Sequence, residues 1–224
     1  DVSIQTLGGF RVERRGAAAD PGWPSRDAQR LLKRLVAARG ATVTWPVLGP
    51  MADAVDDARR ALDPDAAYPA DHYLVTEPDG LRLATERVQV DVNVFLAQAA
   101  AALATEGPAR QEALLAAEAI YTGDFCADDL DAPWAIPLRE EARATYVDLT
   151  RAIADLYSEQ GDHDAAVRYL LRLLSCDPYN GPAHLALVRE LDGAGRYGDS
   201  RRSYRDYAGR MDELGAEPEP YPLP

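Results

Sequence analysis

The chain has 224 residues and a formal net charge of −13, with 24 basic and 37 acidic residues. A chain of this length can form two domains, each with a core of its own. The acidic balance argues against a protein that coats nucleic acid or an acidic membrane, and the most apolar run, Ala99 to Ala104, is too short for a membrane span.

The acidic excess lies in the C-terminal part of the chain. Residues 1–90 hold 12 basic against 13 acidic residues, so the remaining 134 residues hold 12 against 24. Cys126 and Cys176 are too few for a disulfide framework and lack metal-ligand spacing, so we expect reduced packing residues. No secretory leader opens the chain, which favours a cytoplasmic protein, and the absence of an initial Met is typical of a segment cut from a longer chain.

The first 90 residues predict a small α+β domain. Residues 3–14 alternate between apolar and polar side chains around Gly8-Gly9, which indicates two antiparallel strands. Ser25 is placed to cap a following helix, whose core face is Ala28, Leu31, Leu32, Leu35 and Val36. We expect the basic residues of this helix on its other faces: Arg26, Arg30, Lys33, Arg34 and Arg39.

The next segments complete the pattern of a winged helix. Residues 42–45 read as a short strand or an extended turn, residues 52–62 as a helix, and residues 73–83 as a hairpin whose turn is Glu77-Pro78-Asp79-Gly80. The order strand, helix, short strand, helix and hairpin predicts a winged helix over residues 1–88.

From Val90 the pattern is helical throughout. Asp91 is placed to cap a helix that extends to Leu103, Gly107-Pro108 interrupts the pattern, and a second helix extends to Ile120. After an acidic loop at residues 128–133, Trp134 precedes a long helix predicted over residues 138–160. Residues 89–224 therefore form an all-α domain.

One pattern of large and small residues occurs twice in this domain, 34 residues apart. The first copy is Ile153, Tyr157, Gly161, Ala166, Leu170 and Pro178, and the second is Leu187, Leu191, Gly195, Ser200, Tyr204 and Asp212. These positions predict tetratricopeptide-like helical hairpins, in which Gly ends the first helix and Ala or Ser allows close approach of the second. The alternative is an all-helical bundle with a chance period.

Several motifs of the helical part resemble the bacterial transcriptional activator domain, the helical half of the Streptomyces antibiotic regulatory protein (SARP) family. They are Val90-Asp91-Val92 with Phe95, Tyr121 to Phe125, Trp134 with Leu138-Arg139-Glu140-Glu141, Asp177-Pro178-Tyr179, and Leu214-Gly215 with Glu217-Pro218. Residues 7–12 and the hairpin are similar to the OmpR-type winged-helix half of that family. The resemblance implies a mainly α protein, with a winged helix followed by helical repeats, that regulates transcription.

The sequence departs from the family where DNA would be read. Val43 to Leu62 is 20 residues, whereas members of the family usually have over thirty there. Three carboxylates, Asp53, Asp56 and Asp57, stand at the end of the helix expected to enter the groove. Each would repel phosphate, where binding normally gains from counterion release. The resemblance therefore implies the fold and leaves DNA binding open.

Two sets of side chains are candidate binding residues. Arginine pairs with guanine or phosphate, so the DNA candidates are Arg59, Arg60, Arg82, Arg26, Arg30, Lys33 and Arg34. Repeat stacks bind partners in their hollow, and the candidates there are Tyr157, Tyr169, Tyr204 and Tyr207 with Arg168, Arg172, Arg201 and Arg205. The alternatives are solvated helix faces for the first set and helix packing for the second.

No enzyme, metal site or cofactor is indicated. Asp128, Asp129 and Asp131 lack the regular spacing and Gly of a calcium loop, so a solvated loop is expected. His72, His163 and His184 are scattered and read as packing or surface residues.

Two functional hypotheses remain. The first is a transcriptional regulator that contacts DNA through the winged helix, while its repeats mediate self-association or contact with the transcription machinery. The second is an interaction or ligand-sensing module that does not bind DNA and that could form the C-terminal part of a larger regulator. The sequence identifies no small-molecule effector and indicates no membrane contact.

Overall fold

The computed structural model describes residues 2–14 and 23–222. The chain forms two compact units that interleave along the sequence: Asp1–Ala97 with Ile120–Ala142, and Gln98–Ala119 with Arg143–Pro224. These units are not the two domains expected from the sequence, residues 1–88 and 89–224. The boundary between residues 88 and 89 stays a prediction. Each unit is described by itself.

The N-terminal strands form a three-stranded sheet in the first unit. Strand β1 (Val2–Gln5) pairs antiparallel with β2 (Arg11–Arg14), as predicted. Strand β6 (Val88–Val90) pairs with the other edge of β1 in parallel, which the sequence did not indicate. A three-residue strand distant in sequence gives too short an alternation to recognise.

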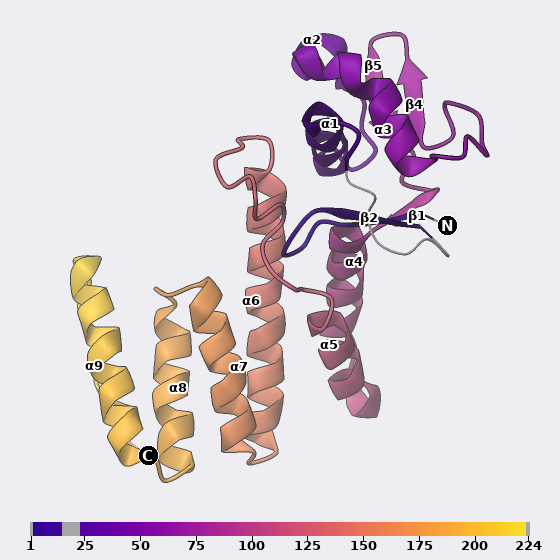
Figure 1. The fold of residues 1–224 in the computed structure, drawn as a ribbon. Coiled ribbons are helices and arrows are strands. Elements are labelled where there is room, and N and C mark those ends of the chain that lie inside the picture. The colour runs from indigo at the N-terminus through magenta and orange to yellow at the C-terminus, as the bar shows by residue number, and fades with distance from the viewer. Residues whose placement is uncertain (1, 15–22, 223–224) are drawn as a thin grey trace. The chain divides into compact units, whose positions relative to one another are not determined.

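The predicted winged-helix elements are present in the first unit (Figure 1). They are α1 (Arg26–Ala37), β3 (Val43–Thr44), α2 (Trp45–Leu48), the 3-10 helix η1 (Gly49–Ala54), α3 (Val55–Leu62), β4 (Leu74–Glu77) and β5 (Gly80–Leu83). The expected cap of α1 is confirmed, because the Ser25 hydroxyl accepts from the amide of Ala28 at 3.2 Å. The expected apolar face of α1 is buried and packs on α3, η1 and β5.

The helix predicted over residues 52–62 is shorter than expected. Only Val55–Leu62 is α-helical, and the preceding turn is 3-10. No side chain caps α3, and Ala54 before it has φ −93° and ψ 10°, outside the helical region. The helix that stands in the position of the DNA-reading helix therefore has eight residues.

The second unit is helical. It contains α5 (Arg110–Glu118), which follows the short 3-10 helix η2 (Gly107–Ala109), together with α7 (His163–Cys176), α8 (Gly181–Gly193) and α9 (Tyr197–Glu213). Helices α4 (Asp91–Leu103) and α6 (Ile136–Glu159) contribute residues to both units. No helix among the described residues is long and apolar enough to cross a membrane.

The repeat prediction is confirmed in the second unit. Helices α6 and α7 form one hairpin, α8 and α9 form the next, and α8 packs against both α7 and α9 (Figure 1). Gly161 and Gly195 have φ of +74° and +72° at the two inter-helix turns, the conformation in which glycine ends a helix without strain. Ala166 and Ser200 are fully buried. The predicted fold class, a mainly α protein with a winged helix and tetratricopeptide-like repeats, is therefore confirmed.

A buried arginine in the first turn of α6 binds the loop that precedes this helix. The Arg139 guanidinium, in a residue 4% exposed, donates to the carbonyl oxygens of Phe125, Cys126, Asp129 and Leu130 at 2.9–3.2 Å. Arginine presents five N–H donors in a rigid fork, so one side chain satisfies four carbonyls of the loop. Residues 125–130 thereby acquire a fixed conformation.

Candidate functional site

Arg59 on α3 is engaged within the winged helix. Its guanidinium donates to the Asp71 carboxylate and the Thr76 hydroxyl, both at 2.8 Å, and to the Asp56 carboxylate at 3.3 Å. The pKa of Asp71 is lowered, first by the Thr76 hydroxyl and also by Arg59. Arg59, whose side chain is 24% exposed, therefore joins α3 to the start of the hairpin.

Arg60 and Arg82 also have carboxylate partners. Arg60 donates to Asp57 one turn earlier on α3. Arg82 on β5 lies 3.1 Å from the Glu77 carboxylate and 3.8 Å from that of Glu86. The pKa of Glu77 is lowered by a hydrogen bond from the Thr42 hydroxyl and by Arg82.

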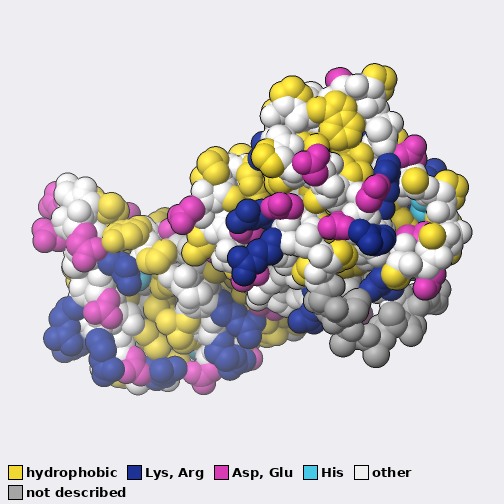
Figure 2. All heavy atoms as spheres, turned by 45° about the horizontal axis from the view of Figure 1, so that its top comes forward, with side chains coloured by type: hydrophobic (Ala, Val, Ile, Leu, Met, Phe, Trp, Pro, Cys, Tyr) yellow, Lys and Arg dark blue, Asp and Glu magenta, His cyan; other side chains and the backbone are white. Residues whose placement is uncertain are grey.

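The predicted DNA-contact surface around Arg59, Arg60 and Arg82 thus carries more acidic than basic groups. Its three guanidinium groups face five carboxylates, those of Asp56, Asp57, Asp71, Glu77 and Glu86. On the face visible in Figure 2, basic and acidic side chains of this unit lie intermixed. Phosphate would have to compete with these carboxylates for each arginine.

The basic residues of α1 divide into exposed and buried groups. Arg26 and Arg30 are exposed, with Arg30 3.7 Å from Asp27, and Arg34 is half-buried. The expectation that Lys33 lies on a solvent face is wrong: this residue is 3% exposed, and its Nζ lies 2.5 Å from Asp129 Oδ2. The apolar period of α1 placed Lys33 away from the core face, and it did not reveal that Asp129 of the loop before α6 lies against this residue.

Three of the residues predicted to line a partner groove form one cluster. Tyr157 and Tyr169 stack with ring centroids 5.7 Å apart, and the Arg172 guanidinium lies 4.9 Å from the Tyr169 centroid. Arg172 also donates to Glu118 of α5 at 2.7 Å, and Tyr146 of α6 donates to the same carboxylate at 3.2 Å. Helix α5 therefore occupies the surface on which Tyr157, Tyr169 and Arg172 lie.

The remaining predicted groove residues lie elsewhere on the repeats. Arg168 is exposed on α7. Arg205 lines a groove of about 600 Å³ over α7, α8 and α9, with Leu171, Leu174 and Leu187 among its apolar residues. Tyr204 donates from its hydroxyl to the Glu219 carbonyl at 2.8 Å. The predicted set is therefore not one site.

The histidines and the acidic loop have protein partners. His163 Nδ1 lies 2.8 Å from Glu190, His184 Nε2 lies 2.9 Å from the Pro178 carbonyl, and His72 stacks on Tyr68. Asp129 is the partner of Lys33. Within residues 2–14 and 23–222, no group of three or more His, Cys, Asp and Glu side chains is arranged to hold a metal ion.

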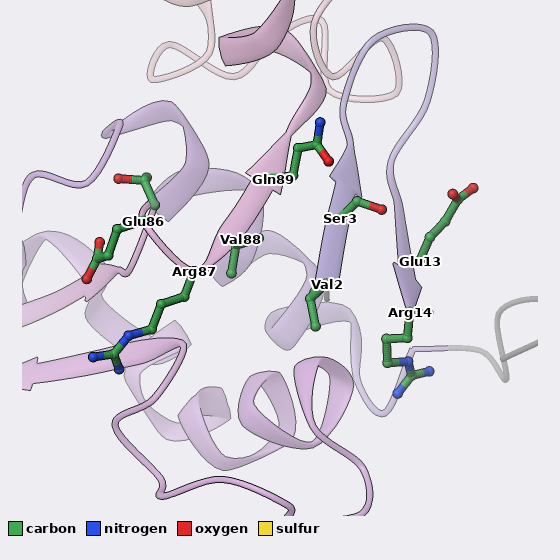
Figure 3. A pocket seen from close by; sticks show the side chains of 9 residues that line it. Val2, Ser3, Glu13, Arg14, Glu86, Arg87, Val88 and Gln89 are labelled. Carbon is green, nitrogen blue, oxygen red and sulfur yellow. The ribbon is translucent and has the colours of Figure 1, made fainter. Parts of the chain in front are cut away.

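A hollow of about 580 Å³ lies along the first sheet (Figure 3). Its charged lining residues are Glu13, Arg14, Glu86 and Arg87, two acidic and two basic. Arg87 also donates to the His72 carbonyl at 2.9 Å. This mixture does not select a ligand of one charge.

Two structurally important residues were not predicted as such from the sequence. Asp91, expected as a helix cap, also binds the backbone just after β1: its carboxylate accepts from the amides of Thr6 and Leu7 at 2.8 and 3.0 Å. Arg139 belongs to a motif that carries the family resemblance, which was the only signal for it. The backbone carbonyls that Arg139 binds and the backbone amides that Asp91 binds leave no local pattern in the sequence.

A family described as the bacterial transcriptional activator domain matches residues 90–221. The fold is similar to that of Mycobacterium tuberculosis EmbR, solved in complex with a low affinity phosphopeptide, with a TM-score of 0.77 and 22% sequence identity. That similarity covers 98% of this chain and 62% of the EmbR chain, so this chain spans less than two thirds of that protein. No curated protein sequence matches the chain. The likeness to EmbR shows the fold, and because the family match covers more than half of the sequence, the chain belongs to the bacterial transcriptional activator domain family.

Proposed function

We propose that the chain is a SARP-type transcriptional regulator that acts in the bacterial cytoplasm, touches DNA through its winged helix and binds protein through its helical repeats. The observation that carries this proposal is the combination of a winged helix with the family's helical domain in one chain. A winged helix presents a helix and a hairpin to the duplex, and helical repeats present extended surfaces to proteins. No catalytic role is part of the proposal.

The ion pairs define what kind of DNA contact is expected. Arg59 and Arg82 are engaged with carboxylates near the hairpin, so the exposed residues among the predicted DNA candidates are Arg60, 68% exposed, with Arg26 and Arg30. Each phosphate contact contributes about −0.9 to the slope of log affinity against log salt for duplex DNA. We therefore expect weak binding and a shallow slope, on the order of −1 to −3.

The second candidate function is an interaction module that does not bind DNA. It is supported by the acidic start of α3, where the Asp56 side chain is 86% exposed. A carboxylate so placed repels phosphate and attracts a basic partner. In this case α3 would serve as a protein contact.

A fluorescence titration with a labelled random duplex, at low and at moderate salt, separates the two. Under the first function, the wild-type chain binds weakly at low salt, Arg60→Ala weakens binding, and Asp56→Asn with Asp57→Asn strengthens it several-fold because two repulsive charges are removed. Arg202→Ala on α9, which is also 68% exposed and paired one turn away, is the matched control. Absence of binding at low salt by both the wild-type chain and the Asn variant would contradict the DNA contact and favour the second function.

A further inference from the structure

The C-terminal segment of the chain, residues 217–222, lies against helices α8 and α9 of the second unit. Helix α9 ends at Glu213, and the chain reverses at Gly215, where the Ala216 amide donates to the Met211 carbonyl at 2.9 Å. The segment that follows is neither helix nor strand. It has proline at every second position, Pro218, Pro220 and Pro222, which favours an extended backbone.

Two tyrosines of α9 hold the backbone of this segment at one residue. The Tyr207 hydroxyl accepts from the Glu219 amide at 3.0 Å, and the Tyr204 hydroxyl donates to the Glu219 carbonyl at 2.8 Å. The amide and the carbonyl of Glu219 therefore both have side-chain hydrogen-bond partners, in place of the backbone partners that a helix or sheet would provide. These contacts are indifferent to the side chain at position 219.

A third contact recognises a particular side chain. The Tyr221 hydroxyl lies 2.5 Å from the Ser200 hydroxyl and donates to the Asp192 carboxylate at 2.8 and 3.0 Å. Ser200 is fully buried and its hydroxyl donates to the Val188 carbonyl at 3.1 Å. The Tyr221 ring packs edge-on against Tyr204 with centroids 5.2 Å apart. Phenylalanine fits this socket in shape and leaves the carboxylate without its donor.

We propose that Asp192, Ser200, Tyr204 and Tyr207 form a binding site for an extended protein segment of the pattern Pro-x-Pro-Tyr, and that residues 217–222 occupy it as an internal ligand. The backbone clamp selects an extended chain, the alternate prolines reduce the entropy lost on binding, and the socket selects the phenol. A partner segment of this chemistry enters when the internal segment leaves. This site would be the surface through which the repeats bind protein, so the inference rests on the protein-binding part of the proposed function.

The internal segment excludes a competing peptide by its tether. A short flexible linker gives an effective concentration of roughly millimolar order, and here only residues 214–216 separate the segment from α9. A free peptide therefore binds measurably only when the segment is removed or its contacts are weakened.

The test uses a fluorescein-labelled peptide of residues 215–222 and fluorescence anisotropy. We expect this peptide to bind the chain truncated after Ala216 at least about tenfold more tightly than the full chain, because the tethered competitor is gone. The same peptide with Phe at the position of Tyr221 should bind at least about tenfold more weakly, since it cannot donate to Asp192. Circular dichroism of the truncated chain checks that the repeats remain folded.

A full-length variant keeps the proposal testable if truncation unfolds α9. Tyr221→Phe in the full chain loosens the internal segment and should raise peptide binding above that of the wild-type chain. Tyr197→Phe is the matched control, because Tyr197 is an exposed tyrosine at the start of α9, and it should leave peptide binding at the wild-type level. If neither the folded truncated chain nor Tyr221→Phe binds the peptide, the segment is only a structural cap and the proposal is overturned.

A second copy of the chain is the competing occupant. Exchange of residues 217–222 between two copies would give a dimer in size-exclusion chromatography that truncation converts to a monomer, and that result would also overturn the proposal of a partner segment. The experiment uses no DNA. Its failure would leave the duplex titration, and the DNA-binding part of the proposed function, unaffected.

Discussion

Lys33 offers a direct test of whether α1 presents its cations to DNA or to the protein interior. Its Nζ lies 2.5 Å from Asp129 Oδ2 and 5.3 Å from the centroid of the Phe10 ring, in a residue 3% exposed. Removing one partner of a buried pair costs about 3–5 kcal/mol, because the other charge stays buried without a partner. The two partners are not equally buried, since the side chains of Lys33 and Asp129 are 4% and 29% exposed.

This difference in burial predicts unequal effects of the two single changes. After Lys33→Met the remaining Asp129 carboxylate regains water, so we expect a loss of about 2 kcal/mol in the free energy of unfolding. After Asp129→Asn the remaining ammonium has little access to water, so we expect a larger loss of about 3–4 kcal/mol. The double variant should cost less than the sum, which gives a coupling energy of roughly 1–3 kcal/mol.

Urea unfolding monitored by circular dichroism measures these values, and Arg30→Met is the control because Arg30 is exposed on the same helix, with 63% of its side chain accessible. A surface change of that kind should stay within about 0.5 kcal/mol of the wild-type value. The reasoning is refuted if Lys33→Met is as neutral as the control, or if it weakens duplex binding without changing stability. Either result would mean that the lysine is available to solvent.

Three other predictions concern Arg139, the two cysteines and Asp155. Arg139→Lys keeps the charge and loses the fork that reaches four carbonyls, so urea unfolding should show a loss of about 2–4 kcal/mol. Burial raises the pKa of the Cys126 thiol to about 12, so Cys126 should react more slowly with iodoacetamide at pH 8 than the half-buried Cys176. Mass spectrometry of the folded chain would measure the two labelling rates, and equal rates would contradict this prediction. Partial desolvation raises the pKa of Asp155 above its unfolded value, but the residue is exposed, so water screens most of the cost of its charge. Asp155→Asn should therefore raise the melting temperature at pH 7 only slightly, and the gain should vanish as the pH falls below the unfolded pKa; a gain of the same size at both pH values would exclude this cause.

The sequence predicted those features whose signal is local. The Ser25 cap, the apolar face of α1 and the hairpin after residue 73 follow from spacing within a few residues, and the structure has all of them. The two repeat turns were predicted for a related reason, since a glycine that ends a helix and a small residue that permits close packing recur at fixed offsets. The start of α3 was misplaced because helical propensity does not reveal the 3-10 turn imposed after Gly49-Pro50.

Features formed by residues distant in sequence were not predictable in this way. The burial of Lys33 depends on a loop almost a hundred residues later, and the position of Arg172 depends on Glu118, which closes α5. Periodicity assigns a side chain to one face of its own helix and does not reveal what covers that face. For the same reason the repeat pattern predicted one shared groove for Tyr204 and Tyr157, whereas Tyr204 holds the C-terminal segment and Tyr157 stacks on Tyr169.

The placement of the cations bears on how such a chain would find DNA. Arg59 and Lys33 each stabilise a contact between separate segments of the first unit, and Arg82 pairs with Glu77 within the hairpin, so a phosphate that drew one of them away would also weaken the winged helix. Binding energy from phosphate contacts would then be partly offset by the cost of those broken contacts. A regulator with this arrangement would gain little affinity from electrostatics alone and would depend on a protein partner to hold it at a promoter, and the proposed site on the repeats beneath residues 217–222 is where such a partner would bind.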